Sequence, residues 1–187
     1  MPDLPPLVSL GAQIISFSEF QKIRDTGILG KVVVTSGYFD PIHPGHISCF
    51  LESKKLGNTL VVLVDGDRRA VEKKGKSFQD IATRCSIVSG IRSVDYVIPL
   101  ETENIDTVAE ALGFIKPAIF AKGGDRCVTS VPIPSAEVDI CQKNGTLIVY
   151  SVGLEKKWAS SNFLQDWVDF KNRGNCPLTP STKPLAR

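Results

Sequence analysis

The sequence is short of histidine, methionine and aromatic residues. Only two histidines and one methionine occur among 187 residues, and aromatic side chains make up 7%. No apolar run approaches the roughly 20 residues that a membrane-spanning helix needs, and the first ten residues lack the basic start of a secretory signal peptide. The net charge of +2 is close to neutral, so the overall charge does not indicate a protein that binds nucleic acid or a membrane. We therefore expect a cytoplasmic protein with neither kind of partner.

The cysteines show no metal-binding or disulfide pattern. The five of them include no C-x-x-C pair, and an odd number cannot all join in closed disulfides. We interpret them as reduced thiols in a reducing compartment. A Walker-type phosphate loop, G-x-x-x-x-G-K-[ST], is also absent from the sequence.

Short apolar runs alternate with segments of helical character. Strands are expected at 31–35, 59–64, 96–98, 118–121 and 146–150, and helices at 19–26, 44–56, 80–94, 106–113, 134–144 and about 161–170. Residues 65–78 are polar and basic and indicate a loop. The alternation predicts an α/β fold, a Rossmann-like doubly wound parallel sheet of about five strands with flanking helices.

The predicted organisation is one main domain with an extension at each end. Residues 1–30 form an N-terminal extension with a short helix, which Ser18 is expected to cap. Residues 31–172 form the domain, and residues 173–187, with three prolines and few apolar side chains, form a flexible C-terminal tail. Ligands of such sheets bind at the carboxyl ends of the strands, so the segments that follow the strands share one rim.

Both histidines, His43 and His46, lie in one turn after an expected strand and at the start of an expected helix. Unpaired backbone N–H groups at a helix start attract anions. Gly37 and Gly45 allow a ligand to approach the backbone, and imidazole N–H groups can donate to phosphate oxygens. The turn therefore predicts a phosphate site. Two alternatives remain, a pair of structural histidines and a zinc site with Cys49 as a further ligand.

The stretch Gly37-Tyr-Phe-Asp-Pro-Ile-His-Pro-Gly-His46 resembles the signature of the cytidylyltransferase-like nucleotidyltransferases, in which G-x-F-D leads into H-x-G-H after the first strand. The resemblance extends over about residues 30–165 and implies that 31–172 is a nucleotidyltransferase domain. Lys122-Gly-Gly-Asp125 is similar to the K-G-G-D of the bacterial heptose-phosphate adenylyltransferases. The segment 67–76 resembles the part of these enzymes that supplies a phosphate-binding lysine.

This resemblance implies a set of site residues. The catalytic residues would be His43, His46 and Lys74. The nucleotide-binding residues would be Ser36, Gly37, Tyr38, Phe39, Asp40, Gly45, Asp67, Lys76, Arg84, Lys122, Gly123, Asp125, Ser160 and Ser161. Plainer interpretations are a solvated loop for the lysines at 73, 74 and 76, a surface position for Arg84, a tight turn at Gly123-Gly124, and helix caps for the two serines. Where the family has a late arginine, the chain has Lys156 and Lys157.

The implied reaction transfers a nucleoside monophosphate from ATP or CTP, with Mg²⁺, to a phosphorylated small molecule. The acceptor phosphate would attack the α-phosphorus directly, so positioning and charge stabilisation would provide the catalysis. A sugar-phosphate acceptor is the first expectation. A glycerol-3-phosphate or phosphoethanolamine cytidylyltransferase is an alternative, and a nucleotide-binding sensor without catalysis is another. The family also implies a homodimer.

Overall fold

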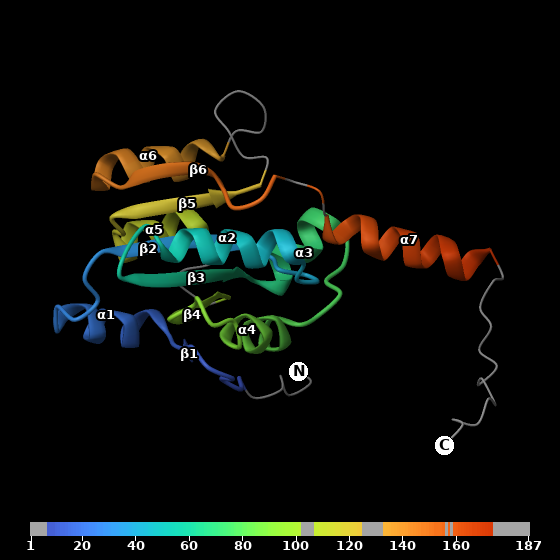
Figure 1. Cartoon of the computed structure of the whole chain (residues 1–187), viewed down its shortest axis with the longest axis horizontal. Helices are drawn as coiled ribbons and strands as arrows, with labels where there is room; N and C mark the ends of the chain where they lie inside the picture. Colours follow the sequence, from blue (N-terminus) through green and yellow to red (C-terminus); the bar gives the residue numbers. More distant parts are fainter. Residues whose placement is uncertain (1–6, 102–106, 125–132, 156, 158, 174–187) are drawn as a thin grey trace, which may run out of the picture.

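Six parallel strands form the centre of the structure, a computed structural model that describes residues 7–101, 107–124, 133–155, 157 and 159–173 (Figure 1). In spatial order, the sheet runs β1-β4-β3-β2-β5-β6. The strands are β1 (Gln13–Ile14), β2 (Val32–Gly37), β3 (Thr59–Asp65), β4 (Tyr96–Leu100), β5 (Ile119–Gly123) and β6 (Leu147–Val152). This topology confirms the prediction of a Rossmann-like α/β fold. The direction of winding reverses beside β2, and such a switch point is where open α/β sheets bind ligands.

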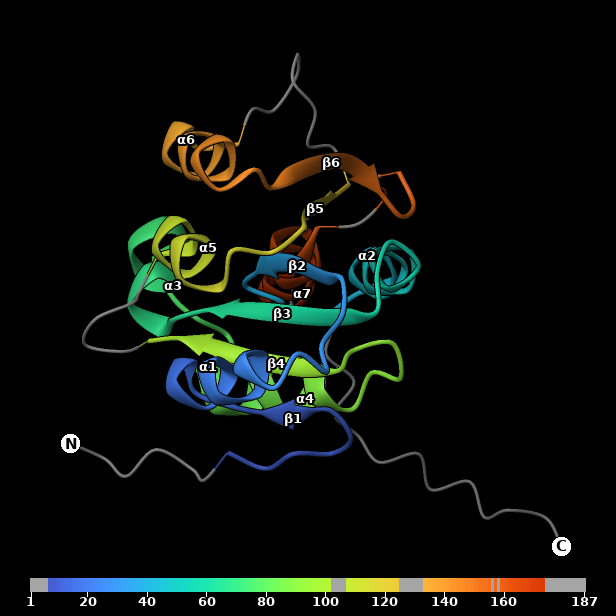
Figure 2. The same cartoon turned by 90° about the vertical axis from the view of Figure 1, so that its left-hand side faces the viewer.

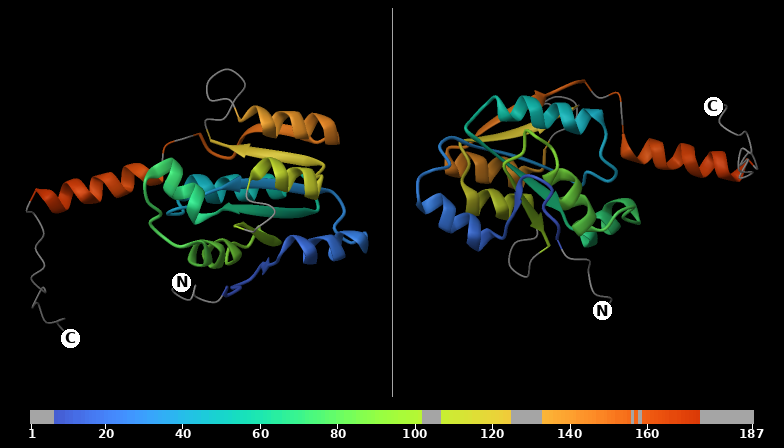
Figure 3. Two further views of the ribbon diagram at one scale, coloured as in Figure 1. Left: turned by 180° about the vertical axis from the view of Figure 1, so that it is seen from behind. Right: turned by 60° about the horizontal axis from the view of Figure 1, so that its bottom comes forward.

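Helices cover both faces of the sheet (Figure 2). One face packs against α2 (Pro44–Lys54) and α4 (Ile81–Ser89), and the other packs against α1 (Phe17–Asp25), α5 (Val108–Ile115) and α6 (Ser135–Asn144). The short helix α3 (Asp67–Lys74) follows β3. The last helix, α7 (Ser160–Asn172), projects away from the layered body (Figures 1 and 3). Among the described residues, no helix combines the length and the apolar character needed to cross a membrane.

The central strand β3 shows why these residues form a buried sheet. Every one of its residues is buried, from Thr59 to Asp65. Val62 and Val64 face the α2 and α4 layer, whereas Val61 and Leu63 face the α1, α5 and α6 layer. Alternate strand side chains point to opposite faces, so a continuous apolar run suits a strand that is covered on both sides.

The N-terminal segment differs from our expectation. It supplies β1, which pairs in parallel with β4 and makes the sheet one strand larger than predicted. A two-residue strand is too short for a periodicity argument to detect. The helix α1 is capped by Ser16 rather than Ser18, because Ser16 and Glu19 form a reciprocal capping box. The predicted extension therefore contributes directly to the sheet.

The prediction of a loop over residues 65–78 was wrong. Residues 67–74 form α3, which ends where Gly75 adopts a left-handed conformation with φ of 81°. Arginine, alanine, glutamate and lysine are strong helix formers, so the helix propensity of this charged segment outweighs its polar character. In contrast, the predicted stop of α6 at Gly145, which is left-handed with φ of 69°, is confirmed. The predicted flexible tail, residues 173–187, lies outside the described residues except for residue 173.

Candidate nucleotidyltransferase site

A pocket of about 370 Å³ lies at the carboxyl ends of β2, β3 and β5. The starts of α2 and α7 also line it, so two helix N-termini with their partial positive charge meet at one cavity. Most of the predicted site residues line this pocket: Ser36, Gly37, Tyr38, Phe39, His43, Gly45, His46, Lys122, Gly123, Ser160 and Ser161. The structure thus brings together residues that are more than 120 positions apart in sequence.

The two histidines form the start of α2 and hold each other in place. His43 is the N-cap, and its Nδ1 accepts a hydrogen bond from the backbone N–H of His46 at 3.4 Å. The backbone N–H of His43 donates to Nδ1 of His46 at 3.3 Å, and the rings stack with centroids 3.6 Å apart. Because Nδ1 is the acceptor in both rings, the neutral form of each carries its proton on Nε2. Each Nε2–H is thereby a donor suited to a phosphate oxygen.

Aromatic packing and α7 fix the position of this turn. The ring of Phe39 meets the rings of His46 and Phe50 edge-on, each at a centroid distance of 5.0 Å. Ser160 Oγ donates to the carbonyl oxygen of Pro41 at 2.7 Å. Our expectation that Ser160 or Ser161 caps α7 was wrong, because Ala159 occupies the N-cap position and makes no side-chain cap. Ser160 instead ties the start of α7 to the histidine turn.

Three predicted nucleotide-binding residues lie behind the pocket wall rather than in its described lining. The Asp40 carboxylate accepts from the backbone N–H groups of Phe78 and Gln79 at 2.8 and 2.9 Å. Arg84 is fully buried, and its guanidinium pairs with the carboxylate of Asp67. These contacts are internal to the protein and favour a role for Asp40, Asp67 and Arg84 in positioning the pocket wall.

The guanidinium of Arg84 joins three loops at the pocket. Its Nη1 donates to the carbonyl oxygens of Tyr38 at 2.8 Å and Asp65 at 2.7 Å, and its Nε donates to that of Gln79 at 3.1 Å. The alternative interpretation of Arg84 as a surface residue is therefore wrong. Arg84 determines where the backbone after β2 and β3 lies.

The basic segment contributes two described side chains to the pocket, and neither is among the predicted site residues. Lys73 and Arg69 of α3 line the pocket, and Lys73 Nζ lies 5.4 Å from the centroid of the Tyr38 ring. Lys76 is exposed and lies outside the described lining. The side chain of Lys74 is outside the described part of the structure, as is Asp125. Near the start of α7, Lys157 lines the pocket, whereas Lys156 is not among the described residues.

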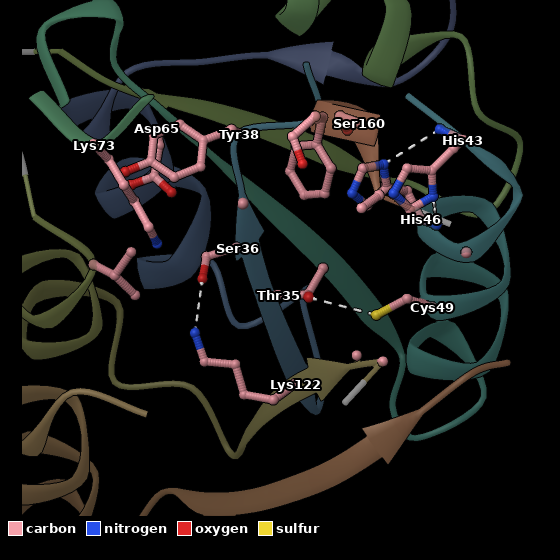
Figure 4. Close-up of a pocket in the computed structure, with 18 of the residues that line it drawn as sticks. Thr35, Ser36, Tyr38, His43, His46, Cys49, Asp65, Lys73, Lys122 and Ser160 are labelled. Atoms are coloured by element: carbon pink, nitrogen blue, oxygen red, sulfur yellow. Dashed lines mark hydrogen bonds between the residues drawn. The ribbon is translucent and has the colours of Figure 1, made fainter. Parts of the chain in front are cut away.

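At the end of β5, Lys122 connects the two sides of the pocket. Its Nζ lies 2.9 Å from Glu137 Oε2 on α6. The same Nζ donates to Ser36 Oγ at 3.3 Å (Figure 4). The Nζ also lies 4.3 Å from the centroid of the Phe120 ring. Close packing explains the glycine at the next position, Gly123. A Cβ there would lie 2.7 Å from Cys49 Sγ. The glycine allows α2 to approach β5 closely.

Sequence reasoning missed several lining residues, among them Asp65 and Glu137. Asp65 is the last residue of β3, and position alone, at the carboxyl end of a central strand, could have indicated it. Glu137 lies on α6, and no motif marks it. Burial raises the pKa of the Asp65 carboxyl, and the nearby cations Arg69 and Lys122 only partly oppose this effect.

The raised pKa of Asp65 predicts how pH affects stability. A carboxyl whose folded pKa exceeds its ordinary value contributes most to stability when protonated, and this contribution is lost as pH rises through the folded pKa. Asp65→Asn should therefore raise the unfolding temperature at neutral pH, and the gain should vanish below the ordinary pKa of 3.8. Thermal unfolding between pH 3.5 and 8 tests this expectation. The exposed carboxylate variant Glu52→Gln should shift the free energy of unfolding by no more than about 0.5 kcal/mol throughout.

The described cysteines are buried thiols. Burial raises the pKa of Cys85 to about 12 and that of Cys141 to about 11, and it also raises the pKa of Cys49 in the pocket wall. Zinc was one alternative for the histidine turn. In the part of the chain that the structure describes, no group of three or more His, Cys, Asp or Glu side chains is arranged to hold a metal.

The fold and the histidine turn together define a class of protein. The model of the cytidylyltransferase-like family matches residues 34–182, and the chain belongs to this family. The resemblance that the histidine turn indicated is thus confirmed at the level of the family.

Individual relatives support this assignment over part of their length. The bifunctional protein HldE of Actinobacillus pleuropneumoniae serotype 5b (strain L20) is 39% identical over 97 residues, which are 51% of this chain and 20% of that protein. HldE of Haemophilus influenzae (strain PittEE) is 40% identical over the same length and shares. The chain therefore spans about a fifth of the length of these curated relatives.

Two solved structures are similar in fold. The lipopolysaccharide core biosynthesis protein from Thermoplasma volcanium GSS1 has a TM-score of 0.55 and 28% identity, covering 68% of this chain and 99% of that one. The pantoate-beta-alanine ligase from Francisella tularensis, complexed with beta-gamma ATP and beta-alanine, has a TM-score of 0.57. It is 14% identical and covers 87% of this chain and 77% of that one, so it shows likeness of fold alone.

Proposed function

We propose that the protein transfers a nucleoside monophosphate from ATP or CTP to a sugar phosphate and releases pyrophosphate. One observation carries the proposal: two mutually capped imidazoles stand at the start of α2, in the same pocket as the start of α7 and Lys122. Helix starts and imidazole N–H donors together favour a polyphosphate. The similarity to HldE proteins and to a lipopolysaccharide core biosynthesis protein favours a sugar phosphate as the acceptor.

In the proposed reaction, an oxygen of the acceptor phosphate forms a bond to the α-phosphorus of the nucleotide. The bond from the α-phosphorus to the bridging oxygen breaks, and that oxygen leaves with its electron pair on pyrophosphate. The attacking oxygen is already anionic, so no general base is required. The chain would contribute fixed donors aimed at the negative charge that grows on the α-phosphoryl group, chiefly Nε2–H of His43 and His46.

The other lining groups would hold the two substrates. Ser160, Ser161 and the first turn of α7 would bind the β- and γ-phosphates, with Lys157 in the place of the family's arginine. A lysine supplies a point charge and not a planar fork, so this contact would be less directional. Mg²⁺ would arrive with the nucleotide and neutralise part of the triphosphate charge. Gly123 and the end of β5 would lie beside the nucleoside.

The test is pyrophosphate release with ATP and CTP in turn, in the presence of Mg²⁺. Heptose-1-phosphate, glycerol-3-phosphate, phosphoethanolamine and phosphocholine serve as acceptors, and a reaction without acceptor is the control. We expect release that requires both one nucleotide and a sugar phosphate. If phosphoethanolamine were the one acceptor that supported release, it would replace the sugar phosphate as the proposed acceptor. Tight nucleotide binding without release from any pair would favour a sensor that has lost catalysis.

A further inference from the structure

We infer that Asp65 and Glu137 recognise the acceptor by accepting hydrogen bonds from its hydroxyl groups. This inference rests on the proposed function, because it concerns the acceptor side of the same pocket. Neither residue belongs to the motifs that identify the family in this sequence. The pair would select an acceptor whose body is a polyol, and the rest of the pocket would bind the phosphates.

The starting observation is a buried carboxylate oxygen that lines the pocket without a hydrogen bond. Asp65 is 6% exposed, and its Oδ1 has no hydrogen-bond partner among the described residues. The cation paired with it, Arg69, keeps its Nε 3.7 Å from that oxygen, which exceeds hydrogen-bonding distance. A buried carboxylate oxygen without a donor is costly, and such an atom in a pocket wall suits a donor from a ligand.

A second buried carboxylate faces the same cavity. Glu137 is also 6% exposed and lines the pocket from α6. Lys122 Nζ lies 2.9 Å from its Oε2, and the same lysine donates to Ser36 Oγ. Two carboxylates that are acceptors only, together with a serine hydroxyl, make a surface that accepts several hydrogen bonds.

The position of Asp65 separates this surface from the phosphate-binding turn. In the close-up, Asp65, Tyr38 and Lys73 gather on one side of the pocket, and His43 and His46 lie on the other (Figure 4). Ser36 and Lys122 lie below both groups in this view. An acceptor that reaches toward the histidines with its phosphate can therefore direct its other end at Asp65.

The charges nearby favour hydroxyl groups over an ammonium group. Each carboxylate already has a cation beside it, Arg69 for Asp65 and Lys122 for Glu137, and Lys73 lines the pocket as well. A ligand ammonium would meet these cations and be repelled. A hydroxyl group donates a hydrogen bond without adding charge. The pocket thus fits a phosphorylated polyol better than phosphoethanolamine.

The experiment compares ligands that differ in hydroxyl groups, by titration calorimetry without nucleotide and with EDTA present. Glycerol-3-phosphate and propyl phosphate share a phosphate and a three-carbon chain, and only the first carries hydroxyls. We expect glycerol-3-phosphate to bind about tenfold more tightly than propyl phosphate and heptose-1-phosphate to bind more tightly still. Phosphoethanolamine should bind no better than propyl phosphate.

Variants locate the effect. Asp65→Asn and Glu137→Gln keep the shape of each side chain but remove its charge, and each should reduce the preference for glycerol-3-phosphate about three- to tenfold. Binding of propyl phosphate should stay unchanged in both, and Glu52→Gln should leave all affinities as in the original protein. Unfolding temperatures would show that both variants fold.

Several results would overturn the inference. They are equal binding of propyl phosphate and glycerol-3-phosphate, tighter binding of phosphoethanolamine, an equal loss for all ligands in the variants, and a preference that needs Mg²⁺. The absence of measurable binding by any of these esters would do so as well. Hydroxyl-dependent binding without pyrophosphate release would instead refute the proposed reaction and leave the assignment of Asp65 and Glu137 intact.

Discussion

Replacing His46 with alanine is expected to lower turnover by about 10²- to 10³-fold, the usual loss when one donor to a developing oxyanion is removed. The structure adds a stability effect, because Nδ1 of His46 accepts from the backbone N–H of His43 and closes a capping box. Loss of a cap costs about 1 kcal/mol. Steady-state pyrophosphate release and urea unfolding of the same samples measure the two effects separately.

The variant His46→Asn separates the two roles of this histidine. The asparagine side-chain oxygen can take the place of Nδ1 as acceptor for the His43 N–H, but it presents no group in the position of Nε2. We expect His46→Asn to regain most of the lost stability and little of the lost turnover. If activity returned together with stability, the imidazole would be a helix cap and the catalytic proposal for His46 would fail.

Replacing Arg84 with methionine should produce the largest loss of stability, about 3 kcal/mol. The guanidinium is fully buried. It donates hydrogen bonds to the carbonyl oxygens of Tyr38, Asp65 and Gln79, and it pairs with the Asp67 carboxylate. Methionine fills the space of the side chain but leaves these acceptors without their donor. This loss of stability is at the low end of what breaking a buried ion pair costs, because the Asp67 side chain is 25% exposed. Urea unfolding at pH 7 gives the free-energy difference.

The matched control is Arg92→Met. Arg92 is exposed on the segment after α4, and its replacement should change the free energy of unfolding by no more than about 0.5 kcal/mol. Nucleotide affinity provides the second readout for Arg84. Unchanged stability with a large drop in nucleotide affinity would mean that Arg84 contacts the nucleotide, as the family resemblance implies, and would contradict the positioning role.

Local sequence signals determined much of the fold. Short apolar runs predicted β2 and β3, and Gly145 predicted the end of α6. The turn from Gly37 to His46 was recognisable because a short contiguous segment contains the whole phosphate-binding element, strand end and helix start included. Signals of this kind depend only on residues that are adjacent in the chain, so they can be recognised in the sequence directly.

Predictions failed where local signals were weak or conflicting. The strand β1 exists because β4 offers it an edge, and its two residues carry no pattern of their own. In α3, polarity suggested a loop while helix propensity favoured a helix. The cap of α1 moved from Ser18 to Ser16 because Glu19 completes a capping box only with Ser16.

The sequence by itself determined the family, the layered α/β architecture and the two histidines at the start of a helix. The tertiary structure decided which other side chains share their pocket. Arg84 and Asp67 lie behind the pocket wall, whereas Asp65 and Glu137 line the cavity. The physical reason is that parallel strands gather their carboxyl ends at one edge of the sheet. Residues such as Asp65 and Glu137, 72 positions apart in sequence, therefore meet through strand order and helix packing, which no local pattern encodes.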